Sequence, residues 1–328
     1  MKNNALVEAL HTGMGTEIAH KIYGRHSRKA LQFVEKEARR LEQRLSRFLP
    51  ESDVSRVNRS AGMKSEKISV ETCEILSHAM KCSVISKGLF DITAGPLIDL
   101  WDYRNATKAP ERSYIDQVLP LVNYKDLNLD ADRRRAGLQN TGQSIDLGGI
   151  AKGFASDRFM EIFREYGITS AYSNIGGNVS LLGNKPDGSP WLVGIRHPRQ
   201  TGLLGAIAVT GKAVVTSGDY ERYFVDREGR RFCHILNPIT GYPAESGLIS
   251  VTVADDSAVT ADLLSTAIFV AGLERGLALI KQYPGAEAVL VDRALQVYVT
   301  QGLQKCFQAA CEMRVNYLSE KERDHAEW

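Results

Sequence analysis

The sequence predicts a single α+β domain built around a mixed sheet. Short apolar stretches bounded by glycine or proline, which are typical of strands, alternate irregularly with amphipathic segments of helical spacing. No linker rich in proline, glycine and serine separates two halves, and no repeat of about 20–50 residues occurs. With 328 residues, 43% of them hydrophobic, the chain is long enough to bury a large core. We expect the domain to span residues 1–318 and a charged tail to follow over 319–328.

Two amphipathic helices are expected in the first part of the chain. The first covers residues 27–46, and its apolar stripe consists of Leu31, Val34, Ala38, Leu41 and Leu45. The stripe has heptad spacing but is too short to indicate a coiled coil, so it favours packing on a sheet. The second helix is expected over 70–86, with Ser69 as its N-cap and Gly88 after its end. The Gly95–Pro96 pair that follows indicates a turn.

From about residue 121 the pattern changes to short strands and two further helices. The expected strands and hairpins cover 121–130, 136–140, 144–148, 170–183, 191–198, 205–218, 230–238, 249–254 and 286–300, the last with its turn at Asp292 and Arg293. Helices are expected over 151–166 and over 260–283, the latter with Thr260 as its N-cap. This order predicts a mixed sheet with flanking helices.

Composition argues against several classes of protein. The formal net charge of +2 creates no strong field, so nothing in it indicates nucleic acid or an anionic membrane as a partner. The five cysteines form no CxxC pair and no His/Cys cluster with zinc spacing, which favours reduced thiols in a cytosolic protein. The N-terminus has no unbroken apolar segment of a signal peptide, and no run approaches the roughly 18 apolar residues that span a bilayer. We therefore expect a soluble cytoplasmic protein without a membrane segment.

The stretch IDLGGIAKG, residues 145–153, is the first candidate for a binding site. It is not a P-loop, because Gly153 follows Lys152 where a serine or threonine is required, and its glycines do not have Rossmann spacing. The glycines, the free N–H groups of the following helix and Lys152 nevertheless suit a phosphate. Asp146 would repel that phosphate unless a cation lies between them, or unless Asp146 binds a neutral donor such as a flavin N–H or a ribose hydroxyl. An ordinary strand-to-helix turn with Asp146 as a local cap is the alternative.

A second candidate site lies in the helix expected over 260–283. Asp262, Ser265 and Thr266 have the spacing i, i+3 and i+4, which puts three hard oxygens on one helical face. Such oxygens suit Mg²⁺, usually together with substrate phosphate. The alternative is an ordinary first turn, in which the helix dipole favours Asp262.

Three further segments carry polar groups that can face a ligand. They are the double-glycine turn Gly176–Gly177, the group Thr216, Ser217 and Asp219 after an apolar run, and His234, expected on a strand ahead of a turn over 238–241. A lone histidine is more often structural, but its ordinary pKa of about 6.5 suits general-base catalysis.

Nine motifs, taken in order, resemble those of a known family. They are GMGT, SRFLPESDVSRVN, FDITAGPLIDLW, IDLGGIAKGFASD, SNIGGNVSLLG, WLVGIRHP, TSGDYERYF, HILNPITGYP and ADLLSTA. The chain resembles the ApbE family, the FAD:protein FMN transferases, from about Gly13 to about Val299. The resemblance implies a two-lobed α+β fold with the flavin between the lobes. It also implies Mg²⁺-dependent transfer of the FMN half of FAD, through a phosphoester, to a threonine or serine of a target flavoprotein, with release of AMP. Some members of the family instead hydrolyse FAD to FMN and AMP.

The resemblance also implies roles for individual residues. The metal ion would be held by Asp262 and Thr266, with Ser265 and the main-chain carbonyl of Gly149. FAD would lie along Met14, Ser46, Leu89, Phe90, Asp91, Asp146, Lys152 and Leu236. His234 is the candidate base for the incoming hydroxyl, so His234 and the metal-binding Asp262 would be the catalytic residues. Asp146 is then explained as a contact to a neutral part of FAD.

The location and two rival functions follow from the same resemblance. Many members of the family are exported and lipid-anchored, whereas no such segment is visible here, so the target flavoprotein is expected in the cytoplasm. A periplasmic location follows instead if a signal has been removed. One rival function is an FAD pyrophosphatase, with water in place of the protein hydroxyl. The other is a flavin-binding carrier without catalysis.

Overall fold

The structure, a computed structural model, is built on one nine-stranded sheet. It describes residues 6–310 and 312–318, so the charged tail expected over 319–328 lies outside the described residues. From one edge to the other, the strands are β1 (Leu6–Gly13), β2 (Thr16–Tyr23), β6 (Ser170–Ile175), β7 (Asn178–Leu182), β10 (Ala213–Gly218), β13 (Leu248–Asp255), β14 (Glu287–Asp292), β15 (Val297–Thr300) and β17 (Val315–Leu318). Each neighbouring pair is antiparallel except β15 and β17, which are parallel. The predicted mixed sheet is confirmed.

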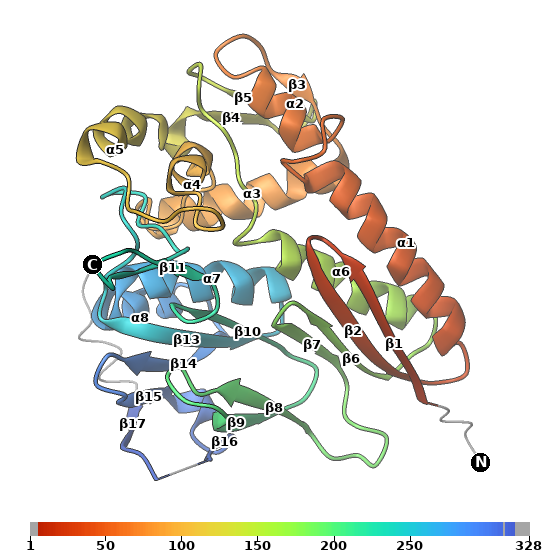
Figure 1. Ribbon diagram of the computed structural model, residues 1–328. Coiled ribbons are helices and arrows are strands. Elements are labelled where there is room, and N and C mark those ends of the chain that lie inside the picture. Colours follow the sequence, from red (N-terminus) through yellow and green to blue (C-terminus); the bar gives the residue numbers. More distant parts are fainter. Residues whose placement is uncertain (1–5, 311, 319–328) are drawn as a thin grey trace.

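Each face of this sheet is covered by its own layer. Helices lie over one face and enclose the larger core: α1 (Ser27–Leu45), α6 (Ala151–Glu165), α7 (Ala258–Ala271) and α8 (Leu273–Lys281). Phe159, Phe163 and Phe269 are the largest side chains buried there. The opposite face packs on a three-stranded sheet of β8 (Trp191–Arg196), β9 (Leu203–Val209) and β16 (Phe307–Ala309). Figure 1 shows the helices above the main sheet and the small sheet below it.

A second lobe stands above the helical layer in Figure 1. It contains α2 (Asp53–Arg59), α3 (Val70–Ile85), α4 (Gly95–Trp101), α5 (Arg112–Val118) and the antiparallel strands β3 (Glu66–Lys67), β5 (Arg135–Leu138) and β4 (Leu127–Asp130). A separate aromatic cluster joins α4 and α5 to the hairpin of β11 (Tyr223–Val225) and β12 (Arg231–Cys233). Within it, the Trp101 indole donates to the Gly241 carbonyl at 2.8 Å. The two-lobed α+β architecture is therefore confirmed.

The strongest sequence patterns are confirmed as helices. The helices expected over 27–46, 70–86 and 151–166 correspond to α1, α3 and α6. Ser69 caps α3 as expected, because its hydroxyl accepts from the Thr72 N–H. Of the predicted stripe on α1, all but the partly buried Leu31 lie in the core. The stripe contacts β1, as expected, and also α6.

Several boundaries differ from the predictions. The helix expected over 260–283 is divided into α7 and α8 at Gly272, whose φ of 85° interrupts it. The N-cap of α7 is Ser257 rather than Thr260, and its hydroxyl accepts from the Thr260 N–H. The Gly95–Pro96 pair begins α4 instead of forming an isolated turn, since proline is tolerated in the first turn of a helix.

Three predicted strands are absent or much shorter in the structure, and the one expected over 230–238 is reduced to β12. Residues 144–148 are not a strand, and only Ser144 forms a single bridge, with Ala94. The strand expected over 121–130 is reduced to β4, because two 3₁₀ turns, η1 (Leu119–Leu121) and η2 (Tyr124–Asp126), precede it.

The N-terminal hairpin was not predicted at all. β1 and β2 pair over their full length around the turn Met14–Gly15. Both turn residues have positive φ, 52° for Met14 and 70° for Gly15, which is the geometry of a type I′ turn. β1 is an edge strand whose residues alternate between exposed and half-buried, so its apolar alternation is weak in the sequence.

The chemistry of the cysteines agrees with the prediction of reduced thiols. Cys73, Cys82, Cys233 and Cys306 are free, and Cys311 lies outside the described residues. Within the described part of the chain, each helix is too short or too polar to cross a bilayer.

Candidate active site

Two glycine-containing turns and the second half of β10 lie at one end of the main sheet. β10 pairs with β7 through Ala213–Ser180 and Val214–Val179, so the second half of β10, with Ser217, runs past β7 toward the Gly176–Gly177 turn. The β1–β2 turn lies at the same end, because a Cβ on Gly176 would come within 3.0 Å of the Thr16 Cβ. The topology thus brings Met14, Gly176 and Ser217 to a common edge, next to α7.

Asp262 stands where α6 and α7 cross. Its side chain is buried, and Oδ2 accepts from the Gly153 N–H at 2.9 Å. Its Oδ1 has only the Lys152 ammonium beside it, at 3.4 Å. The two helices come this close because Gly153 has no side chain, and a Cβ there would lie 2.8 Å from the Asp262 Cβ. The structure therefore unites the two candidate sites of the sequence, and it leaves Asp262 Oδ1 held by a lysine side chain rather than by a main-chain N–H group.

The hydroxyls of the second candidate site form a hydrogen-bonded group with β10. Ser217 Oγ lies 2.9 Å from Ser265 Oγ and 3.3 Å from Thr266 Oγ1. Gly149 faces Thr266 from the loop before α6, since a Cβ on it would lie 3.6 Å from Thr266 Oγ1 and 3.1 Å from the Phe90 ring. Glycine is thus required for this loop to approach α7.

The loop before α6 is held by residues far away in the sequence. The Asn58 side chain accepts from the Ile145 N–H at 2.7 Å and donates to the Ile145 carbonyl at 3.0 Å. Asp146 Oδ1 accepts from the Gly148 N–H at 2.7 Å, and Oδ2 accepts from Arg47 at 3.2 Å. Arg47 also pairs with Asp99 of α4. Asp146 is therefore both a local cap, as one interpretation expected, and half of an ion pair.

The run Leu89–Asp91 lies beside this loop. Leu89 and Phe90 are buried, and the Ile92 carbonyl accepts from the Asp146 N–H at 2.8 Å. Asp91 accepts from the N–H and hydroxyl of Thr93 and from the Tyr124 N–H. Burial raises the pKa of Asp91. Its carboxylate organises the surrounding loops in this arrangement.

The remaining predicted contacts come from three other segments of the chain. Ser46 ends α1 immediately before Arg47, and its hydroxyl accepts from the Phe48 N–H at 3.2 Å. Leu236 forms a single bridge with Pro243 and packs against the aromatic cluster of the second lobe. Met14 packs partly against the main core.

His234 follows directly after β12 rather than lying on a strand. Its Nδ1 lies 3.0 Å from the Arg222 carbonyl oxygen, which can only accept, so Nδ1 carries the hydrogen and Nε2 keeps a lone pair. The pKa of His234 is lowered to about 4, mainly by burial and also by the positive charges of Arg222 and Lys152.

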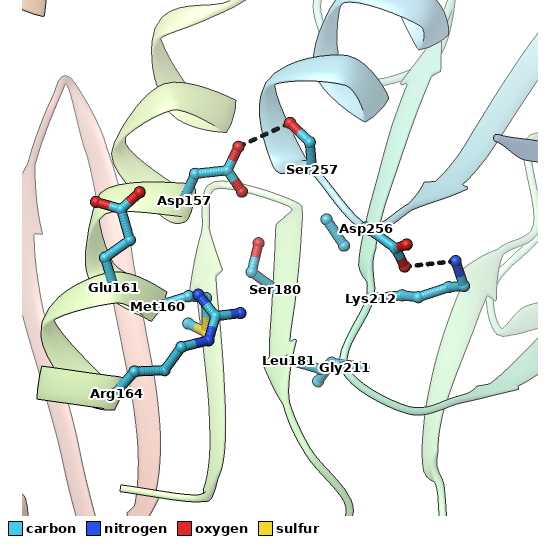
Figure 2. Close-up of a pocket in the computed structure, with 11 residues that line it drawn as sticks. Asp157, Met160, Glu161, Arg164, Ser180, Leu181, Gly211, Lys212, Asp256 and Ser257 are labelled. Atoms are coloured by element: carbon cyan, nitrogen blue, oxygen red, sulfur yellow. Dashed lines mark hydrogen bonds and ion pairs between the residues drawn. The ribbon is translucent and has the colours of Figure 1, made fainter. Parts of the chain in front are cut away.

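Two hollows lie near the second lobe and at the far end of β10. An open groove of about 440 Å³ lies on the second lobe, with Asp91, Tyr124 and Ile239 in its lining. The smaller cleft of Figure 2, about 180 Å³, lies at the opposite end of β10 from Ser217. Asp157 and the Lys212–Asp256 ion pair line this cleft, whereas the predicted site residues do not.

Sequence reasoning gave no role to Arg47 and Asn58, and it named Ser217 only as a polar group that can face a ligand. Arg47 and Asn58 fall inside the motif SRFLPESDVSRVN, and Ser217 falls inside TSGDYERYF, so the motifs marked their segments. Their contacts span 99, 87 and 49 residues of chain respectively, which no local pattern records.

Comparison with known proteins decides the family. The model of the ApbE family matches residues 14–290. The chain belongs to the ApbE family. Among similar proteins, an ApbE relative from Klebsiella pneumoniae named FAD:protein FMN transferase is 32% identical over 296 residues, which cover 89% of this chain and 91% of that protein. A Treponema pallidum protein with the same name is 30% identical over 79% of this chain and 76% of its own length.

Solved ApbE structures are similar throughout the fold. The ApbE protein of Thermotoga maritima has a TM-score of 0.85 and 31% identity, covering 92% of this chain and 99% of its own. The apo flavinyl transferase ApbE of Pseudomonas stutzeri has a TM-score of 0.78 and 32% identity, covering 88% of this chain and 92% of its own.

Proposed function

We propose that this protein transfers the FMN half of FAD to a threonine or serine hydroxyl of a target flavoprotein, with Mg²⁺, and releases AMP. The observation that carries the proposal is the convergence of Asp262, Thr266, Lys152 and the Gly149 loop at one end of the main sheet. The name FAD:protein FMN transferase, shared by the similar proteins, supports it. The activity is assigned to the single domain over residues 1–318.

The donors at Asp262 fit Mg²⁺ bound together with a substrate diphosphate. Among the described residues, no three His, Cys, Asp or Glu side chains gather into a metal-binding group, so a site made of protein carboxylates alone does not fit. Asp262 with one available oxygen, the Thr266 hydroxyl and the Gly149 carbonyl are instead the few hard oxygens that Mg²⁺ combines with phosphate. When bound, the ion would neutralise charge on the phosphate oxygens.

Lys152 and the start of α6 suit the phosphates of FAD. Lys152 stands at the beginning of α6, where the helix dipole favours an anion, and its ammonium already lies 3.4 Å from Asp262. Asp146 is paired with Arg47 and the Gly148 N–H, so its charge is already partly compensated. This arrangement supports the assignment of Asp146 to a neutral part of FAD.

His234 is suited to take the proton of the incoming hydroxyl. Because Nδ1 donates to the Arg222 carbonyl, Nε2 is the basic nitrogen, and the lowered pKa keeps it unprotonated near neutral pH. In the proposed step the acceptor oxygen bonds to the phosphorus of the FMN half, and the bond from that phosphorus to the bridging oxygen breaks. The bridging oxygen leaves with AMP, and the hydroxyl proton passes to His234.

The test uses purified protein with FAD and Mg²⁺, with and without a candidate flavoprotein acceptor. AMP is followed by chromatography and the intact acceptor by mass spectrometry. We expect the acceptor to gain the mass of FMN, and EDTA to abolish the gain. AMP and free FMN without any acceptor would support a pyrophosphatase instead. FAD that stays intact with a series of acceptors would support a carrier.

We also propose that the protein works in the cytoplasm. The free thiols of the four described cysteines support this compartment, because disulfides persist mainly in oxidising ones. Cell fractionation checks it, and recovery from the periplasm would contradict it.

A further inference from the structure

Three hydroxyl groups between β10 and α7 form one continuous chain. Ser217 Oγ lies 2.9 Å from Ser265 Oγ and 3.3 Å from Thr266 Oγ1. The Ser265 hydroxyl in turn donates to the main-chain carbonyl of Asp262 at 2.9 Å. Each hydroxyl has a single hydrogen, so the direction of every bond in the chain follows from counting hydrogens.

The count starts at the buried end. Ser265 is fully buried, and its one hydrogen is used on the Asp262 carbonyl, which can only accept. Toward Ser217 it therefore accepts, and Ser217 donates its own hydrogen to Ser265. Toward Thr266, Ser217 can then only accept, so the Thr266 hydrogen turns toward β10. The direction of the chain is Thr266 to Ser217 to Ser265 to the Asp262 carbonyl.

This direction fixes where the lone pairs of Thr266 lie. With its hydrogen on the β10 side, the hydroxyl presents lone pairs to its other sides. One of its neighbours there is the loop before α6, since a Cβ on Gly149 would lie 3.6 Å from Thr266 Oγ1. A hydroxyl that ligates a cation must offer a lone pair and keep its hydrogen away from the ion.

We propose that Ser217 is a positioning residue that orients the Thr266 hydroxyl for Mg²⁺, an inference that rests on the proposed function. Partners outside the ligand sphere orient ligands in this way, and their loss typically weakens metal binding about 10-fold to 100-fold. Ser265 then acts through Ser217, because it accepts the Ser217 hydrogen and donates its own to the Asp262 carbonyl.

The neighbouring residue on β10 provides a matched control. Thr216 is also half-buried and also hydroxyl-bearing, but successive side chains of a strand point to opposite faces. Its hydroxyl lies 2.8 Å from that of Thr252 on β13, away from α7. Removing the Thr216 hydroxyl therefore disturbs the same strand without touching the chain.

The test is a titration of the whole protein with Mn²⁺, a spectroscopic probe for Mg²⁺, followed by the electron paramagnetic resonance signal of the free ion. We expect Ser217→Ala to weaken Mn²⁺ binding about 10-fold. Ser217→Thr, which keeps the hydroxyl, should bind like the unaltered protein, and so should Thr216→Val. In transfer assays, Ser217→Ala should need about 10-fold more Mg²⁺ and reach the same rate when Mg²⁺ saturates.

Asp262→Ala separates failure of this inference from failure of the proposed function. If Asp262→Ala loses Mn²⁺ while Ser217→Ala binds it normally, the positioning role is wrong and the metal site stands. If Asp262→Ala also binds normally, the metal site itself is wrong. Unaltered protein that binds no Mn²⁺ would overturn the inference too, because the hydroxyl chain would then not orient Thr266 for a metal ion.

Discussion

Two aspartates secure the crossing of α6 and α7, and each comes from one helix to meet the start of the other. Asp157 of α6 accepts from the N–H groups of Ala258 and Val259 and from the Ser257 hydroxyl, so both its oxygens are occupied. Asp262 of α7 accepts one N–H, that of Gly153, and keeps Oδ1 beside Lys152 at 3.4 Å. Figure 2 shows Asp157 turned toward Ser257 at the start of α7.

The two aspartates differ in the role that we assign to them: Asp157 stabilises the fold, and Asp262 belongs to the proposed metal site. A carboxylate with both oxygens filled by a helix start acts as a cap. A carboxylate with one oxygen held only by a lysine side chain can bind a ligand.

Two histidines differ in the same way. His20 forms hydrogen bonds with Ser173 through Nδ1 and with His11 through Nε2. His234 forms a hydrogen bond through Nδ1 only, and its Nε2 has no hydrogen-bond partner among the residues that the structure describes.

The largest expected effect is on activity at Asp262. Asp262→Ala should reduce Mg²⁺-dependent AMP release to background, because it removes the carboxylate of the proposed metal site, while circular dichroism shows a folded protein. Asp157→Ala is the matched control and should remain active. Full activity of Asp262→Ala would mean that the Asp262 carboxylate has no role in the reaction.

The second effect compares the two histidines. His234→Ala should slow transfer to a saturating acceptor by about 10²-fold, because the base for the acceptor hydroxyl is lost. His78→Ala, a change on the exposed face of α3, serves as the control and should leave the rate unchanged. A near-normal rate for His234→Ala would make this residue structural, like His20.

The third effect is on stability at Asp157. Asp157→Ala should lower the free energy of unfolding by about 2 kcal/mol, since the buried N–H groups of Ala258 and Val259 lose their acceptor. Urea denaturation followed by circular dichroism measures the change. The rate of AMP release per folded molecule should stay the same, and a large fall in that rate would show that Asp157 serves the reaction as well.

The smallest effect is the pH dependence of stability due to His20. Burial lowers the pKa of His20 to about 3, and the neighbouring His11 adds to this. As pH falls below about 6.5, the unfolded chain binds a proton at this position and the folded chain does not, so stability is lost. We expect about 1 kcal/mol of loss between pH 6.5 and pH 5.5 from this residue. Urea denaturation of His20→Gln at both pH values should lack this contribution, and an unchanged loss would contradict it.

Patterns that repeat along one element were sufficient to predict much of the fold. The stripe on α1, the Ser69 cap and the apolar residues of α6 each lie within a single segment, and all were predicted correctly. α2 and α5, with seven residues each, are too short to show a stripe. The break at Gly272 was missed because apolar spacing continues on both sides of it.

The candidate site, too, was predictable only where its residues lie on one element. The spacing of Asp262 and Thr266 was visible because they share one helix. Whether Asp262 has a free oxygen depends on Gly153 and Lys152, which lie about 110 residues earlier in the chain. The roles of Arg47 and Ser217 likewise depend on hydrogen-bond partners in other segments. Contacts between distant segments are set by tertiary packing, which a local sequence pattern does not record.

Crystals soaked with Mn²⁺ and FAD would test the central claim most directly, that the incompletely partnered aspartate marks the active site. An anomalous difference map locates the ion without assumptions about the reaction. The account predicts a peak bounded by Asp262, Thr266 and the loop at Gly149. A peak in the cleft beside Asp157 and Asp256, with none at Asp262, would contradict it.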